Sequence, residues 1–220
     1  MKRRSKKTAS PKIKPLTART DNQKEYIRAI RENDVVFCSG PSGSGKSFIA
    51  AGIASGDLHK DDIDKVIITR PLVCTGKDIG SLPGGILDKI APYLMPMQEH
   101  FKYFLGQVYY GHYFNNDKIC YKPLEVMRGS TFHDSFMILD EAQNCTIEQI
   151  KMFITRMGEN SKVIINGDID QTDLKHRSGL SVCIDKLKHV EGVSTINFDY
   201  SDIQRNSIIG KILTALEGVA

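Results

Sequence analysis

The feature that most constrains this chain is a glycine-rich segment that follows a short apolar run. It reads Gly-Pro-Ser-Gly-Ser-Gly-Lys-Ser over residues 40–47, directly after the run VVFCS at residues 35–39. This spacing is that of the phosphate-binding loop G-x-x-x-x-G-K-[ST], which joins a strand to a helix. Glycines let backbone N–H groups surround phosphate oxygens, and the helix N-terminus adds partial positive charge. The segment therefore predicts a strand, a loop and a helix that bind the phosphates of ATP.

Individual positions of this loop have expected roles toward ATP and Mg²⁺. Lys46 supplies a point charge to the β- and γ-phosphates, and the Ser47 hydroxyl is an expected Mg²⁺ ligand. A chance match to the pattern in a chain of this length is on the order of 1%. The residues expected to surround the nucleotide are Gly40, Pro41, Ser42, Gly43, Ser44, Gly45, Lys46 and Ser47.

A second polar group follows another apolar run. Phe136–Leu139 (FMIL) is followed by Asp140, Glu141, Ala142 and Gln143. Ligands bind at the carboxyl ends of strands in an open α/β sheet. Asp140 is therefore expected to hold Mg²⁺, directly or through water. Glu141 is expected to accept a proton from the water that attacks the γ-phosphate, which favours hydrolysis over phosphoryl transfer.

A third apolar run, at residues 163–165, ends in Asn166, Gly167, Asp168, Ile169, Asp170 and Gln171. Gln171 is the kind of side chain that orients a water molecule or contacts the γ-phosphate. The alternative is an ordinary turn closed by its aspartate and asparagine side chains. We assign Gln171 to the catalytic group as a prediction.

Apolar runs and helical segments alternate along the chain, which predicts an α/β fold. Buried parallel strands appear as continuous apolar runs, because helices cover both faces of the sheet. The expected strands are 35–39, 66–69, 136–139, 163–165 and 193–198. The expected helices are 21–32, opened by Asp21 as its cap, 47–55, 86–104, 146–157, 180–188 and 205–216.

The basic charge is concentrated at the N-terminus. The chain has 220 residues, of which 40% are hydrophobic, enough for one domain. Residues 1–19 contain eight of the 30 basic residues and no acidic residue, leaving 22 basic against 26 acidic side chains. We expect a flexible basic tail over residues 1–19 and one ATPase domain over residues 20–220. The tail is either an arm that contacts phosphates or a solubilising terminus.

Composition also excludes several classes of protein. No apolar stretch reaches the roughly 18 residues of a membrane span, and no apolar core follows the basic N-terminus as in a secretory signal. The cysteine count is odd and no C-x-x-C spacing occurs, which favours reduced cysteines in the cytoplasm and argues against zinc. The five cysteines are Cys38, Cys74, Cys120, Cys145 and Cys183.

With these elements in order, the chain resembles the PhoH-like family, P-loop ATPases related to the first motor domain of superfamily-one helicases. The resemblance covers residues 21–216 and implies a RecA-like P-loop NTPase fold with a parallel sheet flanked by helices. The segments that carry it, besides the three motifs above, are Asp21–Tyr26 (DNQKEY), Ile68–Pro71 (ITRP), Gly80–Gly84 (GSLPG), Pro92–Leu94 (PYL), Met127–Phe132 (MRGSTF) and Asp202–Asn206 (DIQRN).

The resemblance also implies roles for single residues. Gln23 would read adenine. Arg205 would act as an arginine finger on a neighbouring subunit's ATP, and the family's next residue, a histidine, is Asn206 here. A finger supplied to a neighbour implies a homo-oligomeric ring, by resemblance a hexamer.

Other basic and aromatic residues have more than one interpretation. Arg70, Arg128 and Arg177 are candidates for contacts with nucleic acid, and each could equally form a structural salt bridge. The aromatic residues between Tyr103 and Tyr121 could stack on exposed bases. They are more typical of a packing cluster or subunit contact.

Three functions compete at this point. The first is a helicase-like ATPase that acts on RNA or single-stranded DNA as an oligomer. The second is an ATP-gated switch that hydrolyses ATP without unwinding. The third is a small-molecule kinase of the thymidine kinase type, which is disfavoured because Asn144 stands where such kinases have phenylalanine and no zinc lobe is encoded.

Overall fold

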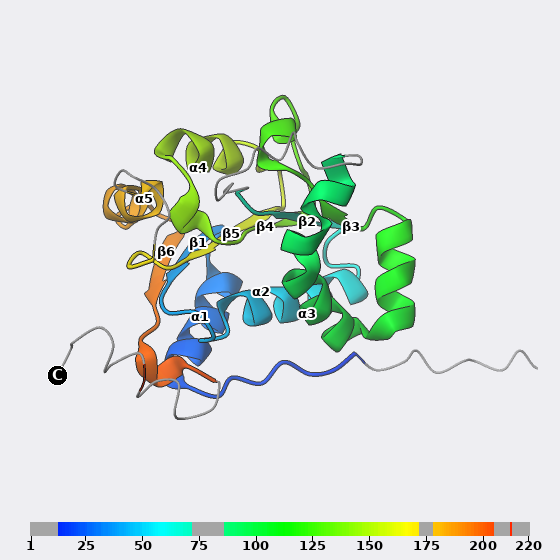
Figure 1. Cartoon of the computed structure of the whole chain (residues 1–220), viewed down its shortest axis with the longest axis horizontal. Coiled ribbons are helices and arrows are strands. Elements are labelled where there is room, and N and C mark those ends of the chain that lie inside the picture. The colour runs from blue at the N-terminus through cyan, green and yellow to red at the C-terminus, as the bar shows by residue number, and fades with distance from the viewer. Residues whose placement is uncertain (1–12, 72–85, 172–177, 205–211, 213–220) are drawn as a thin grey trace, which may run out of the picture.

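A six-stranded parallel sheet forms the centre of the molecule (Figure 1). The computed structural model describes residues 13–71, 86–171, 178–204 and 212, with only the backbone of 86–93. The strand order is β3-β2-β4-β5-β1-β6, and every pair of neighbours is parallel. The strands are β1 (Val35–Ser39), β2 (Lys65–Thr69), β3 (Ile119–Tyr121), β4 (Ser135–Leu139), β5 (Lys162–Gly167) and β6 (Val193–Asn197).

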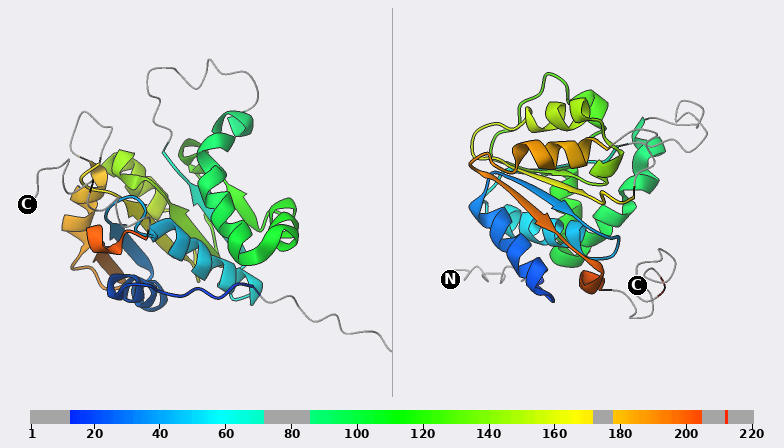
Figure 2. Two further views of the ribbon diagram at one scale, coloured as in Figure 1. Left: turned by 60° about the horizontal axis from the view of Figure 1, so that its bottom comes forward. Right: turned by 90° about the vertical axis from the view of Figure 1, so that its left-hand side faces the viewer.

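Helices cover both faces of the sheet (Figures 1 and 2). On one face lie α1 (Asp21–Glu32), α2 (Lys46–His59) and α3 (Ile86–Asn115), and on the other lie α4 (Ile147–Ile154) and α5 (Gly179–Leu187). Side chains of β1 alternate between two apolar cores, with Val36 in the first and Phe37 in the second. All residues of β1 and β4 are buried, as expected of strands covered on both sides. The predicted fold class is confirmed.

Local differences from the sequence prediction have physical causes. Helix α1 is capped by Thr20, whose hydroxyl accepts a hydrogen bond from Gln23 N (3.2 Å), so the expected cap at Asp21 is wrong by one residue. Helix α3 continues to Asn115 through a break at Gly106 (φ 73°, ψ 160°). The three-residue strand β3 was not predicted. Most of the expected helix 205–216 lies outside the described residues.

The aromatic segment is largely a packing cluster. Phe104, Tyr110 and Tyr113 of α3 and Tyr121 of β3 are buried, whereas Tyr103 is 47% exposed. Tyr110 stacks on Phe114 with ring centroids 5.8 Å apart. Most of these rings are therefore unavailable for stacking on a nucleic-acid base.

Residues 13–19, which the sequence analysis counts with the tail, lie against the domain (Figure 2). Lys14 N donates a hydrogen bond to Phe104 O (2.9 Å), and Ile13 and Leu16 pack on the apolar core. The Lys14 ammonium lies 4.0 Å from the centroid of the Tyr103 ring. This segment thus joins α2 and α3 along their outer side.

The described cysteines are free thiols with little access to solvent. Cys38, Cys145 and Cys183 are buried and Cys120 is half-buried, while Cys74 lies outside the described residues. Burial raises the pKa of Cys145 to about 12, which leaves this thiol protonated and unreactive. No described helix has the length and apolarity that crossing a bilayer requires.

Two glycines one turn apart in α2 test the packing of this layer. A Cβ on Gly52 would lie 2.8 Å from Phe104 Cζ and 3.1 Å from Leu16 Cδ1, whereas one on Gly56 would meet nothing within 4 Å. We predict that Gly52→Ala lowers the free energy of unfolding by about 1–3 kcal/mol through overpacking. The matched Gly56→Ala should raise it by about 0.5–1 kcal/mol, because alanine is the better helix former. Urea denaturation of both variants measures the difference, and equal effects would contradict the packing of Leu16 and Phe104 on α2.

Candidate active site

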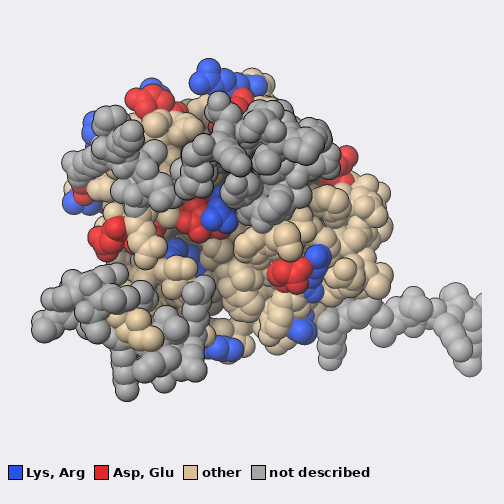
Figure 3. All heavy atoms as spheres, viewed as in Figure 1, with Lys and Arg blue, Asp and Glu red and all other residues tan. Residues whose placement is uncertain are grey.

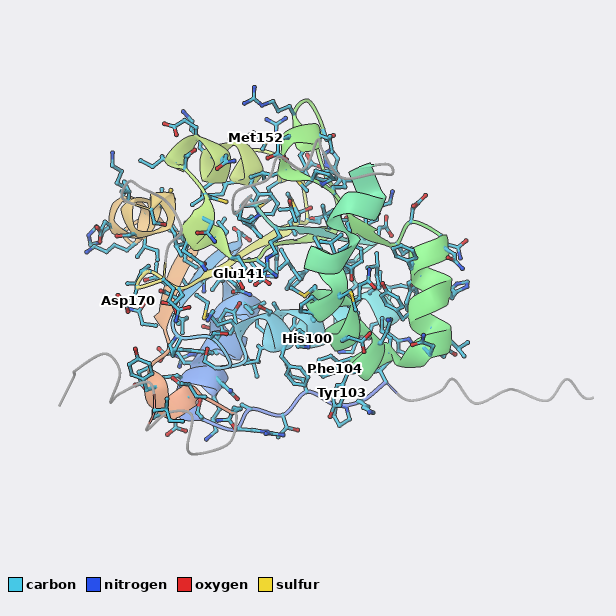
Figure 4. All side chains as sticks on the ribbon, viewed as in Figure 1. His100, Tyr103, Phe104, Glu141, Met152 and Asp170 are labelled. Carbon is cyan, nitrogen blue, oxygen red and sulfur yellow. The ribbon has the colours of Figure 1, made fainter. Side chains whose placement is uncertain are left out.

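A cleft of about 570 Å³ opens at the carboxyl ends of β1, β4 and β5. Parallel pairing of β1 with β5 and of β5 with β4 brings the three strand ends to one edge of the sheet. The phosphate-binding loop, the Asp140–Glu141 pair and the residues after β5 therefore meet there. Figure 4 labels Glu141 and His100, which reach this cleft from the end of β4 and from α3.

The loop after β1 has the conformation expected of a phosphate cradle. Gly43 and Gly45 have φ values of 86° and 96°, a region that favours glycine. Ser44 Oγ donates a hydrogen bond to Pro41 O (2.8 Å) inside the loop. The Lys46 ammonium donates to Gly40 O and to Pro41 O (3.0 Å). The loop thus holds its own lysine close to its backbone at the start of α2.

Ser47 and Asp140 meet at the floor of the cleft. Ser47 Oγ donates a hydrogen bond to Asp140 Oδ1 (2.6 Å) across 93 residues of sequence. Burial and the neighbouring Glu141 carboxylate raise the pKa of Asp140. A hydroxyl and a carboxylate side by side are hard oxygen ligands that suit Mg²⁺, which commonly takes one or two protein ligands beside substrate phosphates. The two side chains fit the predicted metal site.

Glu141 adopts a left-handed backbone conformation (φ 57°, ψ 39°) directly after Asp140. Such a conformation costs a non-glycine residue roughly 1–2 kcal/mol and commonly marks functional positions. Glu141 Oε1 forms an ion pair with Arg70 Nη2 (3.2 Å), and Glu141 Oε2 accepts a hydrogen bond from Gln143 Nε2 (2.6 Å). Arg70, a candidate for contacts with nucleic acid, thus lies beside the candidate general base.

Gln143 is a site residue that sequence reasoning did not assign. Its side chain is buried, and its amide oxygen accepts a hydrogen bond from Asp168 N (3.1 Å) while its amide nitrogen holds Glu141. Gln143 can approach β5 this closely because Gly167 has no side chain. A Cβ on Gly167 would lie 2.9 Å from Gln143 Oε1. Gln143 therefore connects the ends of β4 and β5. Its position two residues after the general base was the only signal available in the sequence.

The segment after β5 closes another side of the cleft. Asp168 is buried, and burial raises its pKa. Its Oδ1 accepts a hydrogen bond from Asp170 N (3.1 Å), and its carbonyl accepts one from Gln171 N (3.2 Å). This turn leaves Gln171 exposed at the edge of the cleft.

Gln23 lines the cleft beside the phosphate-binding loop, and its role toward adenine stays a prediction. Its Nε2 donates a hydrogen bond to Ser44 O (2.9 Å), and its Oε1 accepts one from Arg19 N (2.8 Å). Thr17 and Arg19 also line the cleft. Both residues fall within the segment 1–19 that is predicted to be a tail, so nothing in the sequence assigned them to the site.

Asp202 fastens the segment after β6 to the start of α1. This buried carboxylate accepts hydrogen bonds from Thr20 Oγ1, Asn22 Nδ2 (2.8 Å) and Asp199 N (2.9 Å). Two residues later Gln204 N donates to Gly43 O (3.0 Å) in the phosphate-binding loop. The segment thus joins the helix that carries Gln23 to the loop. Its distance in sequence from Thr20 hid this contact from sequence analysis.

The remaining predicted site residues are not part of this cleft as described. Arg128 is exposed at the end of η2 (Leu124–Met127) and does not line the cleft. Arg177 and Arg205 lie outside the described residues. Their roles stay predictions.

Comparison with known proteins gives consistent matches. The model of a family described as PhoH-like protein matches residues 15–217. A PhoH-like protein of Bacillus subtilis (strain 168) is 41% identical over 212 residues, which make up 96% of this chain and 66% of that protein. The chain thus spans just under two thirds of the length of this curated relative.

Solved structures share the fold at low sequence identity. The large terminase from a thermophilic bacteriophage matches with a TM-score of 0.53 and 12% identity, over 88% of this chain and 49% of the terminase. The UvsW helicase from bacteriophage T4 matches with a TM-score of 0.50 and 13% identity, over 86% of this chain and 64% of the helicase. These likenesses support the RecA-like arrangement of the sheet and helices.

Replacing Asp202 tests whether the segment after β6 holds the site together. Asp202→Ala removes three hydrogen bonds to a buried carboxylate, so we predict a loss of about 2–4 kcal/mol in the free energy of unfolding. Binding of a fluorescent ATP analogue should also weaken, because the segment after β6 would no longer anchor the start of α1, which carries Gln23. The matched control is Asp199→Ala, an exposed carboxylate that caps Ser201, with an expected loss of up to about 1 kcal/mol. Equal losses in both variants would contradict the anchoring role.

Proposed function

The chain belongs to the PhoH-like protein family, and on that premise we propose that it is a P-loop ATPase that binds ATP with Mg²⁺ and hydrolyses the γ-phosphate. One observation carries the proposal. Ser47 of the phosphate-binding loop contacts Asp140 at 2.6 Å, and Glu141 follows Asp140 at the same strand end. A phosphate cradle, a pair of metal ligands and a general base therefore share one cleft.

Each residue of the site has its own role in hydrolysis. The loop N–H groups and Lys46 hold the β- and γ-phosphates, and Ser47 and Asp140 would hold Mg²⁺. The chemistry that Mg²⁺ held by these two residues would supply is neutralisation of the charge on the phosphates. Glu141 accepts a proton from the attacking water, and Gln171 at the edge of the cleft orients that water.

The base-binding side of the cleft favours ATP through Gln23. This amide lies beside the phosphate-binding loop, held by Ser44 O and Arg19 N. A side-chain amide can both donate to and accept from the edge of adenine. To do so, Gln23 exchanges one of its present partners for the base, and Thr17 and Arg19 complete this wall.

We further propose that the ATPase acts on RNA or single-stranded DNA as a helicase-like motor in the cytoplasm. Arg70, Arg128 and Arg177 are the candidates to contact nucleic acid. By family resemblance, a ring of subunits, a hexamer, would supply a second face to the nucleotide, with Arg205 as the arginine finger. The UvsW helicase, which shares the fold, supports this direction.

Steady-state hydrolysis with and without polynucleotide tests the activity. We predict Mg²⁺-dependent phosphate release from ATP that rises when poly(U) or poly(dT) is added and stops when EDTA removes the metal. Glu141→Gln should lower kcat by about 10²–10⁴-fold while ATP still binds, because proton acceptance is lost and the phosphate-binding loop is unchanged. Lys46→Ala should lose nucleotide binding as well. Glu148→Gln, a matched change of an exposed glutamate in α4, should leave the rate unchanged.

Other results would redirect the proposal. Slow hydrolysis whose rate does not change when polynucleotide is added would favour the ATP-gated switch over the motor. Transfer of phosphate to a small acceptor, with Glu141→Gln fully active, would favour a kinase. No hydrolysis by the parent under any condition would refute the ATPase proposal.

Mixing variants tests the proposed ring. If Arg205 acts on a neighbour's ATP, Arg205→Ala and Glu141→Gln subunits are each inactive alone. Co-expressed, they form mixed interfaces in which an intact Glu141 meets an intact Arg205, so we predict recovery of part of the parent kcat. Light scattering should give the mass of a closed oligomer for both variants and the parent. A monomer, or a mixture no more active than its components, would contradict a finger supplied between subunits.

A further inference from the structure

Both carboxylate oxygens of Glu141 are held by neighbouring side chains. Oε1 pairs with Arg70 Nη2 at 3.2 Å, and Oε2 accepts a hydrogen bond from Gln143 Nε2 at 2.6 Å. A general base must turn one of these oxygens toward the water that it activates. In the described arrangement Glu141 is therefore restrained from two sides.

The sheet places Arg70 against Glu141. Thr69 is in register with Leu139, and Asp140 N donates a hydrogen bond to Thr69 O (3.0 Å). Arg70 and Glu141 thus follow the ends of neighbouring parallel strands. In the strand order β2-β4-β5-β1, β2 lies on the side of β4 away from the phosphate-binding loop. Arg70 consequently approaches Glu141 from the side opposite Lys46.

The two restraints differ in strength. Gln143 is buried and tied at both ends of its amide, so it stays in place. The Arg70 contact joins Nη2 to Glu141 Oε1 at 3.2 Å, between side chains that are 27% and 38% exposed. Partly exposed ion pairs of this kind are weak, and a guanidinium binds a phosphate through two parallel hydrogen bonds more strongly. Arg70 is the partner that a phosphate can remove.

We propose, resting on the ATPase function above, that Arg70 is a positioning residue that restrains Glu141 until a phosphate of a single-stranded polynucleotide takes its guanidinium. Glu141 then keeps Gln143 as its partner and has one oxygen ready for the attacking water. Hydrolysis becomes dependent on polynucleotide without any movement of the phosphate-binding loop. Arg70 thus binds the polynucleotide and, by doing so, releases the general base Glu141.

The position of Arg70 favours a polynucleotide over the bound nucleotide as the source of that phosphate. Glu141 lies between Arg70 and the loop in the strand order, and Lys46 serves the loop directly. Arg70 lines the cleft at the edge nearer β2. Figure 3 shows acidic and basic side chains side by side near the middle of the face that it views.

The rate of ATP hydrolysis without polynucleotide tests the restraint. In Arg70→Ala we expect kcat without polynucleotide to rise about two- to fivefold, or up to about 1 kcal/mol at 1.36 kcal/mol per tenfold change. Added poly(U) or poly(dT) should then give little further increase. Arg70→Lys, which keeps the charge but loses the planar fork, should lie between this variant and the parent. Arg28→Ala, a matched loss of an exposed arginine on α1, should behave as the parent.

Each other outcome overturns the proposal. A lower kcat without polynucleotide in Arg70→Ala would mean that Arg70 assists the reaction, for example at the γ-phosphate. An unchanged kcat with stimulation lost would mean that Arg70 only binds the strand. An unchanged kcat with stimulation kept would remove Arg70 from both roles.

A binding measurement separates this proposal from the ATPase proposal. Without ATP, removing the Glu141 carboxylate takes away the acidic partner that competes for Arg70, so Glu141→Ala should bind labelled oligo(dT) more tightly than the parent in fluorescence anisotropy. In the Arg70→Ala background the same change should have little effect, because the coupling requires both side chains. A gain of equal size in both backgrounds would overturn the restraint. If the parent fails to hydrolyse ATP, this cycle still reports on the Arg70–Glu141 contact.

Discussion

Parallel pairing of β1, β5, β4 and β2 is the constraint on which the candidate site depends. Because the strands run in one direction, four segments distant in sequence finish at the same edge. The 2.6 Å contact between Ser47 and Asp140 follows from this register, as does the approach of Arg70 to Glu141. Antiparallel pairing at any one position would send its polar residues to the opposite edge. The apolar runs that bury the sheet therefore also determine which side chains can cooperate.

Small backbone features refine what the sheet brings together. Gly167 ends β5 without a side chain, and this lets the Gln143 amide reach Asp168 N (3.1 Å). Glu141 takes a left-handed conformation, so its carboxylate can meet Gln143 two residues later. Gln143 thereby links the general base to the turn that carries Gln171. The polar residues of the site therefore form one connected network, and a displacement at the end of β4 would also shift residues at the end of β5.

Whether a feature of the fold or the site could be predicted from the sequence depends on how far apart in the chain the interacting residues lie. The apolar runs at β1, β4 and β5 and the loop at residues 40–47 are local patterns, and they predicted the fold and the neighbouring polar strand ends. Thr20 and Asp21 are both good capping residues, so the sequence alone could not identify Thr20 as the helix cap. The strand β3 has three residues, too few for a period to appear. The anchor from Asp202 to Thr20 spans 182 residues and is visible only in three dimensions.

Groups expected to bind ATP or nucleic acid already have partners within the protein. Lys46 donates to loop carbonyls, Gln23 to Ser44 O, and Arg70 pairs with Glu141. Binding a nucleotide or a strand is therefore an exchange of partners, and its free energy is the difference between the old contacts and the new. Exchanging a carbonyl for a phosphate strongly favours Lys46, since the new acceptor is charged. For Arg70 the exchange replaces a partly exposed ion pair with Glu141 by two parallel hydrogen bonds to a phosphate, which favours the phosphate by a smaller margin because both acceptors are charged. When the phosphate leaves, Arg70 can pair with Glu141 again, so its position depends on whether the ligand is bound.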